Sequence, residues 1–383
     1  MPWLETNPMD QRSRFIDAYL SDAFTKAELC ERFHISRRTG DKWIARYDAQ
    51  GRAGLGDRSR APKHCPHRIA ADVAALLCAA RRKHPDWGPV KLLDWLRPRH
   101  PDVAWPAPST AGDLLKRRGL IRPRRRRYHA THPGVVPATT HAPNDLWTAD
   151  FKGEFRTGDD EYCYPLTVAD LHTRYLLACT GMRSTRTHGA QTVFELLFRE
   201  YGLPCAIRTD NGVPFATTGL HGLSTLSVWW IRLGIQHQRI QPASPQQNGA
   251  HERMHKTLKR GAIRPPRANL QAQQRAFNRF RTLYNDERPH EALNGTTPSS
   301  RYRHSGRSYP SVLPAIEYPG HFEIREITAA GTFRFGEKLF FLSNSLKHLP
   351  VGLEEVSDGI WSVYFCHVLL ARLDERSQTL IRG

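Results

Sequence analysis

The 383-residue sequence has few cysteines, no long apolar run and a shortage of acidic residues. Its seven cysteines are odd in number and scattered, with no C-x-x-C pair, which argues against a disulfide framework and against a structural zinc site. No apolar segment approaches the length of a membrane span. The first residues lack a basic region followed by an apolar stretch, which argues against a signal peptide. We therefore expect no membrane partner and a cytoplasmic location.

Basic residues clearly outnumber acidic ones. Lys and Arg total 56 against 37 Asp and Glu, which gives a formal charge of +19. Such an excess favours a polyanionic partner, because Lys and Arg that face phosphates release condensed counterions. A ribosomal or membrane-surface protein would share this charge, so the charge alone does not identify the partner. The length allows roughly two to four domains, and a hydrophobic fraction of 39 % suffices for globular cores.

Residues 1–55 are predicted to form a helix-turn-helix DNA-binding domain. Thr25 to Glu28 fits a capping box at the start of a short second helix. Ser36 then fits the N-cap of a third helix, which opens with basic residues. The residues expected to face a DNA groove and its phosphates are Arg37, Arg38 and Lys42. The alternative is a plain three-helix bundle with a solvated basic face, but the short second helix and the basic third helix favour the DNA-reading version.

Residues 66–128 are predicted to form a second helix-turn-helix-like domain with a basic tail. Helical patterns run over Ile69–His84, Pro89–Leu96 and Ser109–Gly119, the last opening on a Ser-Thr cap. The basic tail contains Arg124, Arg125, Arg126 and Arg127, which we expect to track a DNA groove. A disordered, solvated tether is the alternative, and the two interpretations are compatible.

Residues 144–305 alternate strand and helix signals in the order β-β-β-α-β-α-β-α, which predicts a mixed sheet flanked by helices. Residues 316–375 instead carry short strand signals, with tight hairpin turns expected at Gly336-Glu337 and Asp358-Gly359. A small β-barrel is the natural closure of such a segment. The predicted fold class is therefore multidomain α/β, with N-terminal helix-turn-helix units, an α/β core and a small C-terminal β-barrel.

Three acidic residues stand in separate, recognisable frames. Asp150 lies on a predicted strand, and Asp210 follows a short strand and precedes an Asn-Gly turn. Glu252 lies on a helix predicted to begin at Ser244 and Pro245. Phosphoryl transfer at a DNA backbone uses carboxylates that hold two divalent ions roughly 3.5–4 Å apart. Singly, each residue has an ordinary explanation, such as a hairpin turn for the Asn-Gly pair, but the three frames together favour a metal-dependent catalytic site.

Two lysines share the predicted helix face of Glu252. Lys256 and Lys259 follow it at i+4 and i+7, which places the three side chains on one side of a helix. We expect these lysines to contact a DNA end beside the metal site. The alternative is an exposed Glu–Lys pair, which contributes only about 0.2–0.5 kcal/mol.

The three frames, together with the segment Tyr284-Asn285-Asp286-Glu287-Arg288-Pro289-His290-Glu291-Ala292-Leu293, resemble the retroviral-integrase-type DDE core of bacterial insertion-sequence transposases. The similarity covers most of the chain. It implies a ribonuclease-H-like fold for residues 144–305. It also implies that Asp150, Asp210 and Glu252 are catalytic ligands for two Mg²⁺ ions, with Mn²⁺ as the expected substitute metal. The spacing from Asp210 to Glu252 exceeds that usual for integrases, and we expect a loop insertion around Thr217–Leu226.

The resemblance implies a DNA transposase. Such an enzyme would bind the terminal inverted repeats of its own element, cut a strand to expose a 3′-OH and join that end to target DNA. We expect double-stranded DNA as the partner, a homo-oligomer assembled on DNA, and a bacterial, nucleoid-associated location. One alternative is a catalytically inactive, sequence-specific DNA-binding protein, either a decayed transposase or a repressor. Another is a ribonuclease-H-type nuclease that hydrolyses without joining, although paired helix-turn-helix units favour the transposase.

Overall fold

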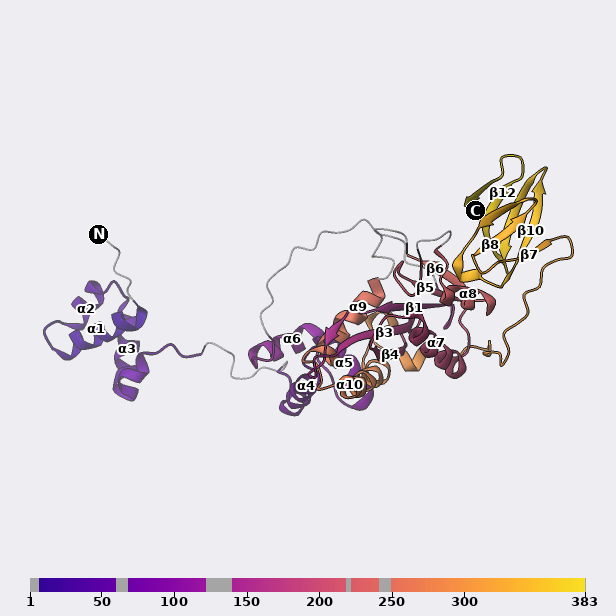
Figure 1. Cartoon of the computed structure of the whole chain (residues 1–383). Helices are drawn as coiled ribbons and strands as arrows, with labels where there is room; N and C mark the ends of the chain where they lie inside the picture. Colours follow the sequence, from indigo (N-terminus) through magenta and orange to yellow (C-terminus); the bar gives the residue numbers. More distant parts are fainter. Residues whose placement is uncertain (1–6, 60–67, 122–139, 218–221, 241–248, 383) are drawn as a thin grey trace. The chain divides into compact units, whose positions relative to one another are not determined.

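The computed structural model describes residues 7–59, 68–121, 140–217, 222–240 and 249–382. The chain divides into two compact units, Met1–Ile69 and Ala70–Gly383 (Figure 1). Within the described ranges, every helix is too short or too polar to cross a membrane.

The first unit is a bundle of three helices, α1 (Pro8–Leu20), α2 (Lys26–Arg32) and α3 (Arg37–Gln50), closed by a 3₁₀ turn at Gly51–Leu55. The predicted capping box is present: the Thr25 N–H donates to a Glu28 carboxylate oxygen at 2.8 Å, and the Glu28 N–H donates to the Thr25 hydroxyl at 3.4 Å. Ser36 caps α3 as predicted, accepting from the Thr39 N–H at 3.2 Å. The core of this unit consists of Phe15, Ile16, Leu29, Cys30, Trp43, Ile44 and Leu55.

Helices α2 and α3 approach each other closely at Gly40. A Cβ atom at this position would lie 2.6 Å from the Cys30 Sγ and 3.2 Å from the Phe15 ring. Glycine in a helix interior costs about 1 kcal/mol relative to alanine, but any side chain here would push the two helices apart. Gly40 therefore helps to fix the orientation of α3, whose first turn carries the predicted DNA contacts.

The second unit begins with three helices, α4 (Ala71–Lys83), α5 (Pro89–Leu96) and α6 (Pro108–Arg117). The predicted Ser-Thr cap of α6 is wrong: Ala107 is the N-cap and Pro108 takes the first helical position, where a missing N–H leaves no intrahelical bond unmade. These helices contact the chain that follows the sheet, since the Lys91 Nζ donates to the Pro289 carbonyl at 3.0 Å. The predicted arginine run at 124–127 lies outside the described residues.

The mixed sheet predicted for the central part of the chain is present. Its strands are β1 (Leu146–Phe151), β2 (Phe155–Arg156), β3 (Tyr162–Asp170), β4 (Leu176–Met182), β5 (Ala206–Thr209) and β6 (Gln236–Arg239). Strand β3 pairs antiparallel with β1, β2 and β4, whereas β5 runs parallel to both β1 and β6. Because parallel strands end on the same side of a sheet, the C-terminal ends of β1 and β5 are neighbours.

Helices cover both faces of this sheet (Figure 1). Helices α7 (Thr187–Tyr201) and α8 (Thr225–Arg232) lie on one face, and α9 (Gly249–Leu258) and α10 (Leu270–Thr282) lie on the other. The first face is filled by large aromatic side chains, including Trp147, Phe194, Phe198 and Trp230. Two π-helical turns, Lys259–Ile263 and Leu283–Glu287, extend α9 and α10, and the short helix α11 (Pro298–Arg301) follows.

The C-terminal segment, predicted as a small β-barrel, is an antiparallel β domain. Its strands are β7 (Glu323–Glu326), β8 (Thr332–Phe335), β9 (Lys338–Phe341), β10 (Pro350–Ser357), β11 (Ile360–Phe365), β12 (Val368–Asp374) and β13 (Thr379–Arg382). Five of them form a sheet in the order β13-β12-β11-β10-β7, and β8 pairs with β9. The hydrophobic core of this domain includes Leu223, Val228 and Ile231, so the β domain packs directly against the α8 segment.

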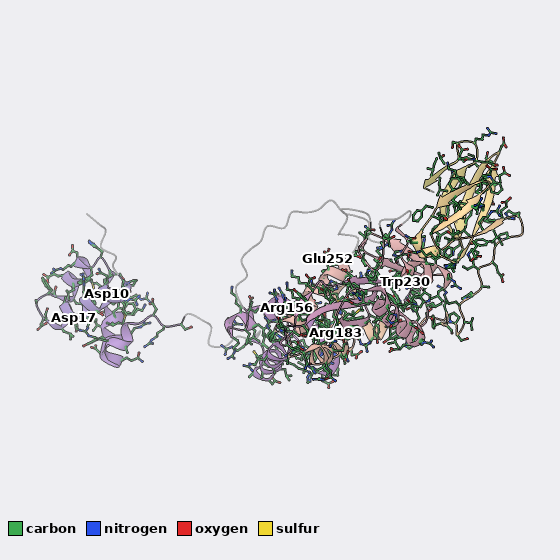
Figure 2. The ribbon with its side chains drawn as sticks, viewed as in Figure 1. Asp10, Asp17, Arg156, Arg183, Trp230 and Glu252 are labelled. Atoms are coloured by element: carbon green, nitrogen blue, oxygen red, sulfur yellow. The ribbon has the colours of Figure 1, made fainter. Side chains whose placement is uncertain are left out.

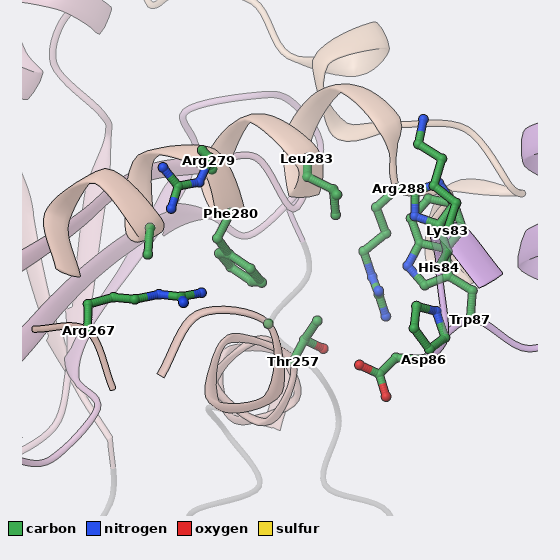
Figure 3. Close-up of a pocket in the computed structure, with 13 residues that line it drawn as sticks. Lys83, His84, Asp86, Trp87, Thr257, Arg267, Arg279, Phe280, Leu283 and Arg288 are labelled. Atoms are coloured by element: carbon green, nitrogen blue, oxygen red, sulfur yellow. The ribbon is translucent and has the colours of Figure 1, made fainter. Parts of the chain in front are cut away.

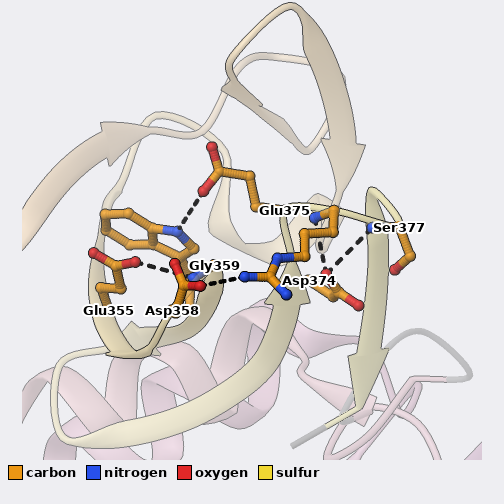
Figure 4. Close-up of polar contacts among 8 residues, drawn as sticks. Glu355, Asp358, Gly359, Asp374, Glu375 and Ser377 are labelled. Carbon is orange, nitrogen blue, oxygen red and sulfur yellow. Dashed lines mark hydrogen bonds and ion pairs between the residues drawn. The ribbon is translucent and has the colours of Figure 1, made fainter.

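Both predicted hairpin turns contain a glycine with a left-handed backbone, at a φ of +57° for Gly336 and +72° for Gly359. The Gly359 N–H donates to a Glu355 carboxylate oxygen at 3.1 Å, and Asp358 pairs with Arg376, which lies in the turn between β12 and β13 (Figure 4). Glycine adopts this conformation without steric cost, which is why the sequence predicted both turns.

Candidate active site

The three acidic residues come from three different elements. Asp150 lies near the end of β1 and its side chain is 20 % exposed, and Asp210 directly follows β5. In the parallel ladder, Thr148 of β1 is paired with Arg208 of β5. Asp150 and Asp210 are each two residues further along, so they come side by side where the two strands end.

The Asn-Gly turn after β5 holds the Asp210 carboxylate. The Gly212 N–H donates to the Asp210 Oδ1 at 3.2 Å, and the Asn211 Nδ2 donates to the Ile240 carbonyl at 2.8 Å. A Cβ atom on Gly212 would lie 3.2 Å from the Asp210 Oδ2, so the turn wraps closely around this side chain. Burial raises the pKa of Asp210 above its ordinary value.

Glu252 lies on α9, the helix that covers one face of the sheet (Figure 2). Its side chain is exposed, whereas its neighbour His251 and the next-turn residue His255 are buried. The described part of α9 begins at Gly249, and the predicted helix start at Ser244 and Pro245 lies outside the described residues.

The charges of the other two acidic residues act on the Asp150 carboxyl group. Burial, and then the negative charges of Asp210 and Glu252, raise the pKa of Asp150 to about 7, against an opposing effect of Lys152. A nearby like charge disfavours ionisation only when it is close and poorly screened. The raised pKa of Asp150 is consistent with the strand register that brings Asp150 and Asp210 together.

A buried polar network lies on the inner side of Asp150. The Thr167 hydroxyl is 2.7 Å from the His251 Nε2 and 2.7 Å from the His255 Nε2, and it donates to the Asp150 carbonyl at 3.0 Å. The Thr148 hydroxyl is 2.8 Å from the His251 Nδ1. Thr167 is the cross-strand partner of Asp150 in the pairing of β3 with β1. The network therefore ties β1, β3 and α9 together directly behind the carboxylate.

Both histidines are neutral. Burial lowers the pKa of His251 to about 3, and burial followed by the neighbouring His251 lowers the pKa of His255 to about 2. One proton assignment fits the Thr167 contacts: each imidazole donates its Nε2–H to Thr167, whose own proton goes to the Asp150 carbonyl. The single proton of the Thr148 hydroxyl is shared between the His251 Nδ1 at 2.8 Å and the Ala169 carbonyl at 3.2 Å. The His255 Nδ1 then faces the Asp150 Oδ2 at 3.7 Å without a charge, so this contact is no ion pair.

Comparison with known proteins identifies the central domain. Residues 140–245 and 233–298 match the integrase core domain family, residues 11–63 match a helix-turn-helix domain family, and residues 39–115 match a homeodomain-like domain family. The chain contains an integrase core preceded by helix-turn-helix domains. The predicted ribonuclease-H-like fold class is thereby confirmed.

The relatives of this integrase core are distant. The chain is 30 % identical over 232 residues to uncharacterized protein K02A2.6 of Caenorhabditis elegans, covering 54 % of this chain and 17 % of that protein. It is 28 % identical over 189 residues to an uncharacterized 31.7 kDa protein of insertion element IS407 from Burkholderia multivorans, covering 49 % of this chain and 65 % of that protein. The chain thus spans less than two thirds of either relative. The HTLV-2 integrase catalytic core, solved in complex with magnesium, matches with a TM-score of 0.34 and 16 % identity over 42 % of this chain and 98 % of that chain.

The integrase core offers two sets of side chains to a cation. In the part of the chain that the structure describes, one group has donor atoms within 4.8 Å of one another: Asp150, His251 and His255. Its imidazoles are engaged by threonine hydroxyls, and Mg²⁺ prefers oxygen ligands, so this group suits Mg²⁺ poorly. Asp150, Asp210 and Glu252 do not form so close a group, as expected of like charges. They supply carboxylate oxygens whose mutual repulsion a divalent cation would relieve, and they fit such an ion.

The predicted DNA contacts lie on exposed surfaces where they are described. Arg37, Arg38 and Lys42 are exposed on α3 of the first unit. Lys256 is exposed on α9, and no ion pair joins it to Glu252 among the described side chains. Glu252, Lys256 and Lys259, which the sequence predicts on one helix face, are all exposed, and Lys259 begins the π-helical turn that follows α9.

The sequence prediction missed the residues behind Asp150, which are Thr148, Thr167, His251 and His255. One signal was available, since His251 and His255 are four residues apart and therefore lie on one helix face beside the exposed Glu252. The two threonines gave no signal, because their role depends on which strands pair in the integrase core.

Proposed function

We propose that this protein is a DNA transposase that binds the terminal inverted repeats of its element, cleaves a strand to expose a 3′-OH and joins that end to target DNA. The observation that carries the proposal is the convergence of Asp150, Asp210 and Glu252 at the ends of β1, β5 and on α9, with a raised pKa at Asp150. The integrase core and the helix-turn-helix domains support the same reading. The enzyme would act as a homo-oligomer on double-stranded DNA, at the bacterial nucleoid.

In the proposed reaction, Asp150, Asp210 and Glu252 would hold two Mg²⁺ ions, or Mn²⁺ in their place, which when bound polarise the phosphodiester and favour deprotonation of the attacking water or 3′-OH. The Gly212 N–H would keep the Asp210 carboxylate in a fixed orientation. Thr167 would hold the end of β1 through the Asp150 carbonyl, and the buried imidazoles would exclude water from the inner side of Asp150.

One assay tests the proposal. Full-length protein is incubated with labelled duplexes carrying the element ends and with target DNA, in Mg²⁺ and again in EDTA. We expect metal-dependent nicks that leave a 3′-OH, followed by joined products. Nicks without joining would favour a ribonuclease-H-type nuclease, and specific binding without nicks would favour an inactive DNA-binding protein.

The carboxylates should be required for chemistry and dispensable for binding. Asp150→Asn, Asp210→Asn and Glu252→Gln keep the side-chain shape but lose an anionic ligand. We expect each to lower cleavage by more than roughly 100-fold, beyond the effect of losing an outer-shell partner of a metal. End binding measured in EDTA should remain within about twofold of the wild type, because it does not involve the metal. A variant that keeps most of its cleavage would remove that residue from the ligand set.

A further inference from the structure

A basic pocket lies beside α9 and is lined in part by the segment Tyr284 to Leu293, for which the proposed chemistry gives no role. The pocket has a volume of about 630 Å³. Its walls come from α5, from the turn between β3 and β4, from α9, and from the 284–293 segment. It therefore joins the second helix-turn-helix region to the helix that carries Glu252.

The lining of this pocket is strongly cationic. The charged side chains are Lys91, Arg174, Arg253, Lys256 and Arg288, opposed by the single carboxylate of Glu291. In the described part of the chain, no ion pair is formed by Arg174, Arg253, Lys256 or Arg288. Arg253 directly follows Glu252, so the positive surface starts next to the proposed catalytic centre.

These cations are held at an electrostatic cost. Burial and then the neighbouring charge of Arg288 lower the pKa of Lys91, and burial lowers the pKa of Arg288. Burial lowers the pKa of Arg174, and the positive charge of Arg253 adds to that effect. The carboxylates of Glu291, Asp86 and Asp170 offset part of this cost for Lys91, Arg288 and Arg174 respectively. Half-buried like charges that form no close ion pair destabilise a fold, so their clustering favours an anionic ligand.

Two buried polar atoms in the lining also lack partners. The Arg174 Nη1 and the His290 Nε2 are inaccessible to solvent and form no hydrogen bond with the described residues. The Arg174 Nη1 is a buried donor, and an unpaired buried donor costs about 1–3 kcal/mol. The His290 imidazole is neutral, since burial lowers its pKa to about 3, and its other nitrogen bonds the Tyr284 backbone, so its Nε2 is an acceptor that does not favour an anion.

A second pocket, of about 290 Å³, shares Thr257 and Arg288 with the first. Its other charged side chains are the cations Lys83, Arg267 and Arg279 and the carboxylate of Asp86. Arg288 extends between Thr257 and Trp87, with Arg267 and Arg279 on the far side (Figure 3). Two connected pockets along one helix suit a chain of regularly spaced phosphates better than a single small anion.

We propose that this double pocket binds the phosphodiester backbone of the DNA strand that enters the catalytic centre. The proposal rests on the proposed function and assigns a role to the 284–293 segment. Arg174, Arg253 and Arg288 contact phosphate oxygens, and Lys91 holds the wall of the pocket through its hydrogen bond to the Pro289 carbonyl. DNA seated here connects α5 to the helix of Glu252.

The test compares DNA binding by full-length variants in EDTA, so that no catalysis is needed. Arg174→Gln with Arg288→Gln removes two of the cations, and Arg183→Gln with Arg334→Gln is the control, since these exposed arginines lie outside both pockets. Each phosphate contact contributes about 0.9 to the slope of log K against log salt. We expect the pocket variant to lose about 2 from that slope and to bind at least tenfold more weakly at low salt, with the control close to the wild type.

Further arms separate the remaining explanations. The pocket variant should unfold at the same temperature as the wild type or higher, because repulsion is relieved; a lower temperature with unchanged DNA binding would mean a structural role. Arg253→Gln changes an exposed position and should lower the salt slope by about 1. This single variant tests the pocket even if the double variant fails to fold. If millimolar inorganic phosphate stabilises the wild type while DNA binding is the same in all variants, the ligand is a small anion and the proposal fails. If the wild type shows no strand transfer but its salt slope still exceeds that of the pocket variant, the proposed transposase activity is refuted and the DNA-binding role of the pocket stands.

Discussion

At Asp150, the stability of the fold and the proposed chemistry oppose each other. Burial and two neighbouring carboxylates raise its pKa to about 7, whereas in the unfolded chain the pKa is 3.8. Above pH 7 the folded state therefore carries a charge at a cost that the unfolded state does not bear. As the pH falls through 7 toward 4, the folded state takes up the proton and the cost disappears.

Asp150→Asn should therefore stabilise the second unit at pH 8. Each tenfold change in proton affinity is worth about 1.4 kcal/mol, so the gain in the free energy of unfolding is at most about 4 kcal/mol. The gain should shrink as the pH falls below 7 and vanish near pH 4. Thermal unfolding of both proteins from pH 4 to 8 in EDTA measures it. Added Mg²⁺ at pH 8 should stabilise the wild type more than the variant, and a gain independent of pH would contradict the explanation.

Thr167 is the residue through which the buried histidines act on β1. Thr167→Val keeps the shape but removes the acceptor of both imidazole N–H groups. Each unpaired donor costs about 1–3 kcal/mol, so the two donors together should lower the free energy of unfolding by roughly 2–6 kcal/mol. Thr167→Ser keeps the hydroxyl and is the matched control. Chemical denaturation compares the three proteins, and equal stability of the valine and serine variants would show that the network contributes little.

At the scale of elements, α9 separates two environments. Its buried side chains include His251, Met254, His255 and Leu258, and its exposed side chains include Glu252, Arg253 and Lys256. The inner side joins the sheet and the outer side faces the proposed DNA. A substitution on the outer side of α9 should therefore change DNA cleavage and joining and have little effect on the stability of the fold.

Lys256→Glu with Lys259→Glu tests the outer side. The new anions would repel the phosphates, and we expect cleavage and joining to fall, more steeply at low salt, because weaker screening strengthens repulsion. The unfolding temperature should barely change, since exposed charges contribute little. Arg334→Glu with Lys347→Glu makes the same charge change on exposed positions of the β domain and is the control. Normal strand transfer by the α9 variant would mean that these lysines face only solvent.

Helices, strands and turns could be predicted from local sequence signals. The buried network and the basic pocket could not, because they depend on contacts between residues far apart in the sequence. The bounds of α5 agree with the sequence to the residue, because Pro89 begins this helix. The frames of the three carboxylates were also local. The Thr167 network depends on β3 pairing with β1, and the basic pocket depends on Lys91 meeting Pro289, contacts that no pattern of neighbouring residues encodes.

At the scale of the whole molecule, the first unit has its own core and the α4–α6 helices belong to the second unit. We propose a division of labour in which residues 1–55 and 66–128 bind the element ends, 144–305 cut and join, and 316–375 support the core. Recognition of bases would then rest on α3, and backbone contacts would lie largely in the second unit.

Arg37→Ala and Arg38→Ala in the full-length protein test this division. Where the side chain reads a base, each should weaken binding to element ends by roughly 1–3 kcal/mol and leave binding to scrambled DNA nearly unchanged. Competition binding with both duplexes at several salt concentrations measures the difference. Equal loss on both DNAs would mean that these arginines contact phosphates, and no loss on either would move recognition away from α3.

The hydrogen bond between Lys91 and Pro289 joins residues separated by 198 positions. A ribosome adds about 5–20 residues each second, so this contact becomes possible roughly 10–40 s after α5 is made. The first unit has its own hydrophobic core, formed by residues between Phe15 and Leu55, and can fold on the nascent chain during that interval. If residues 1–55 bind DNA as proposed, the growing chain could hold DNA before the proposed catalytic residues Asp210 and Glu252 have been made.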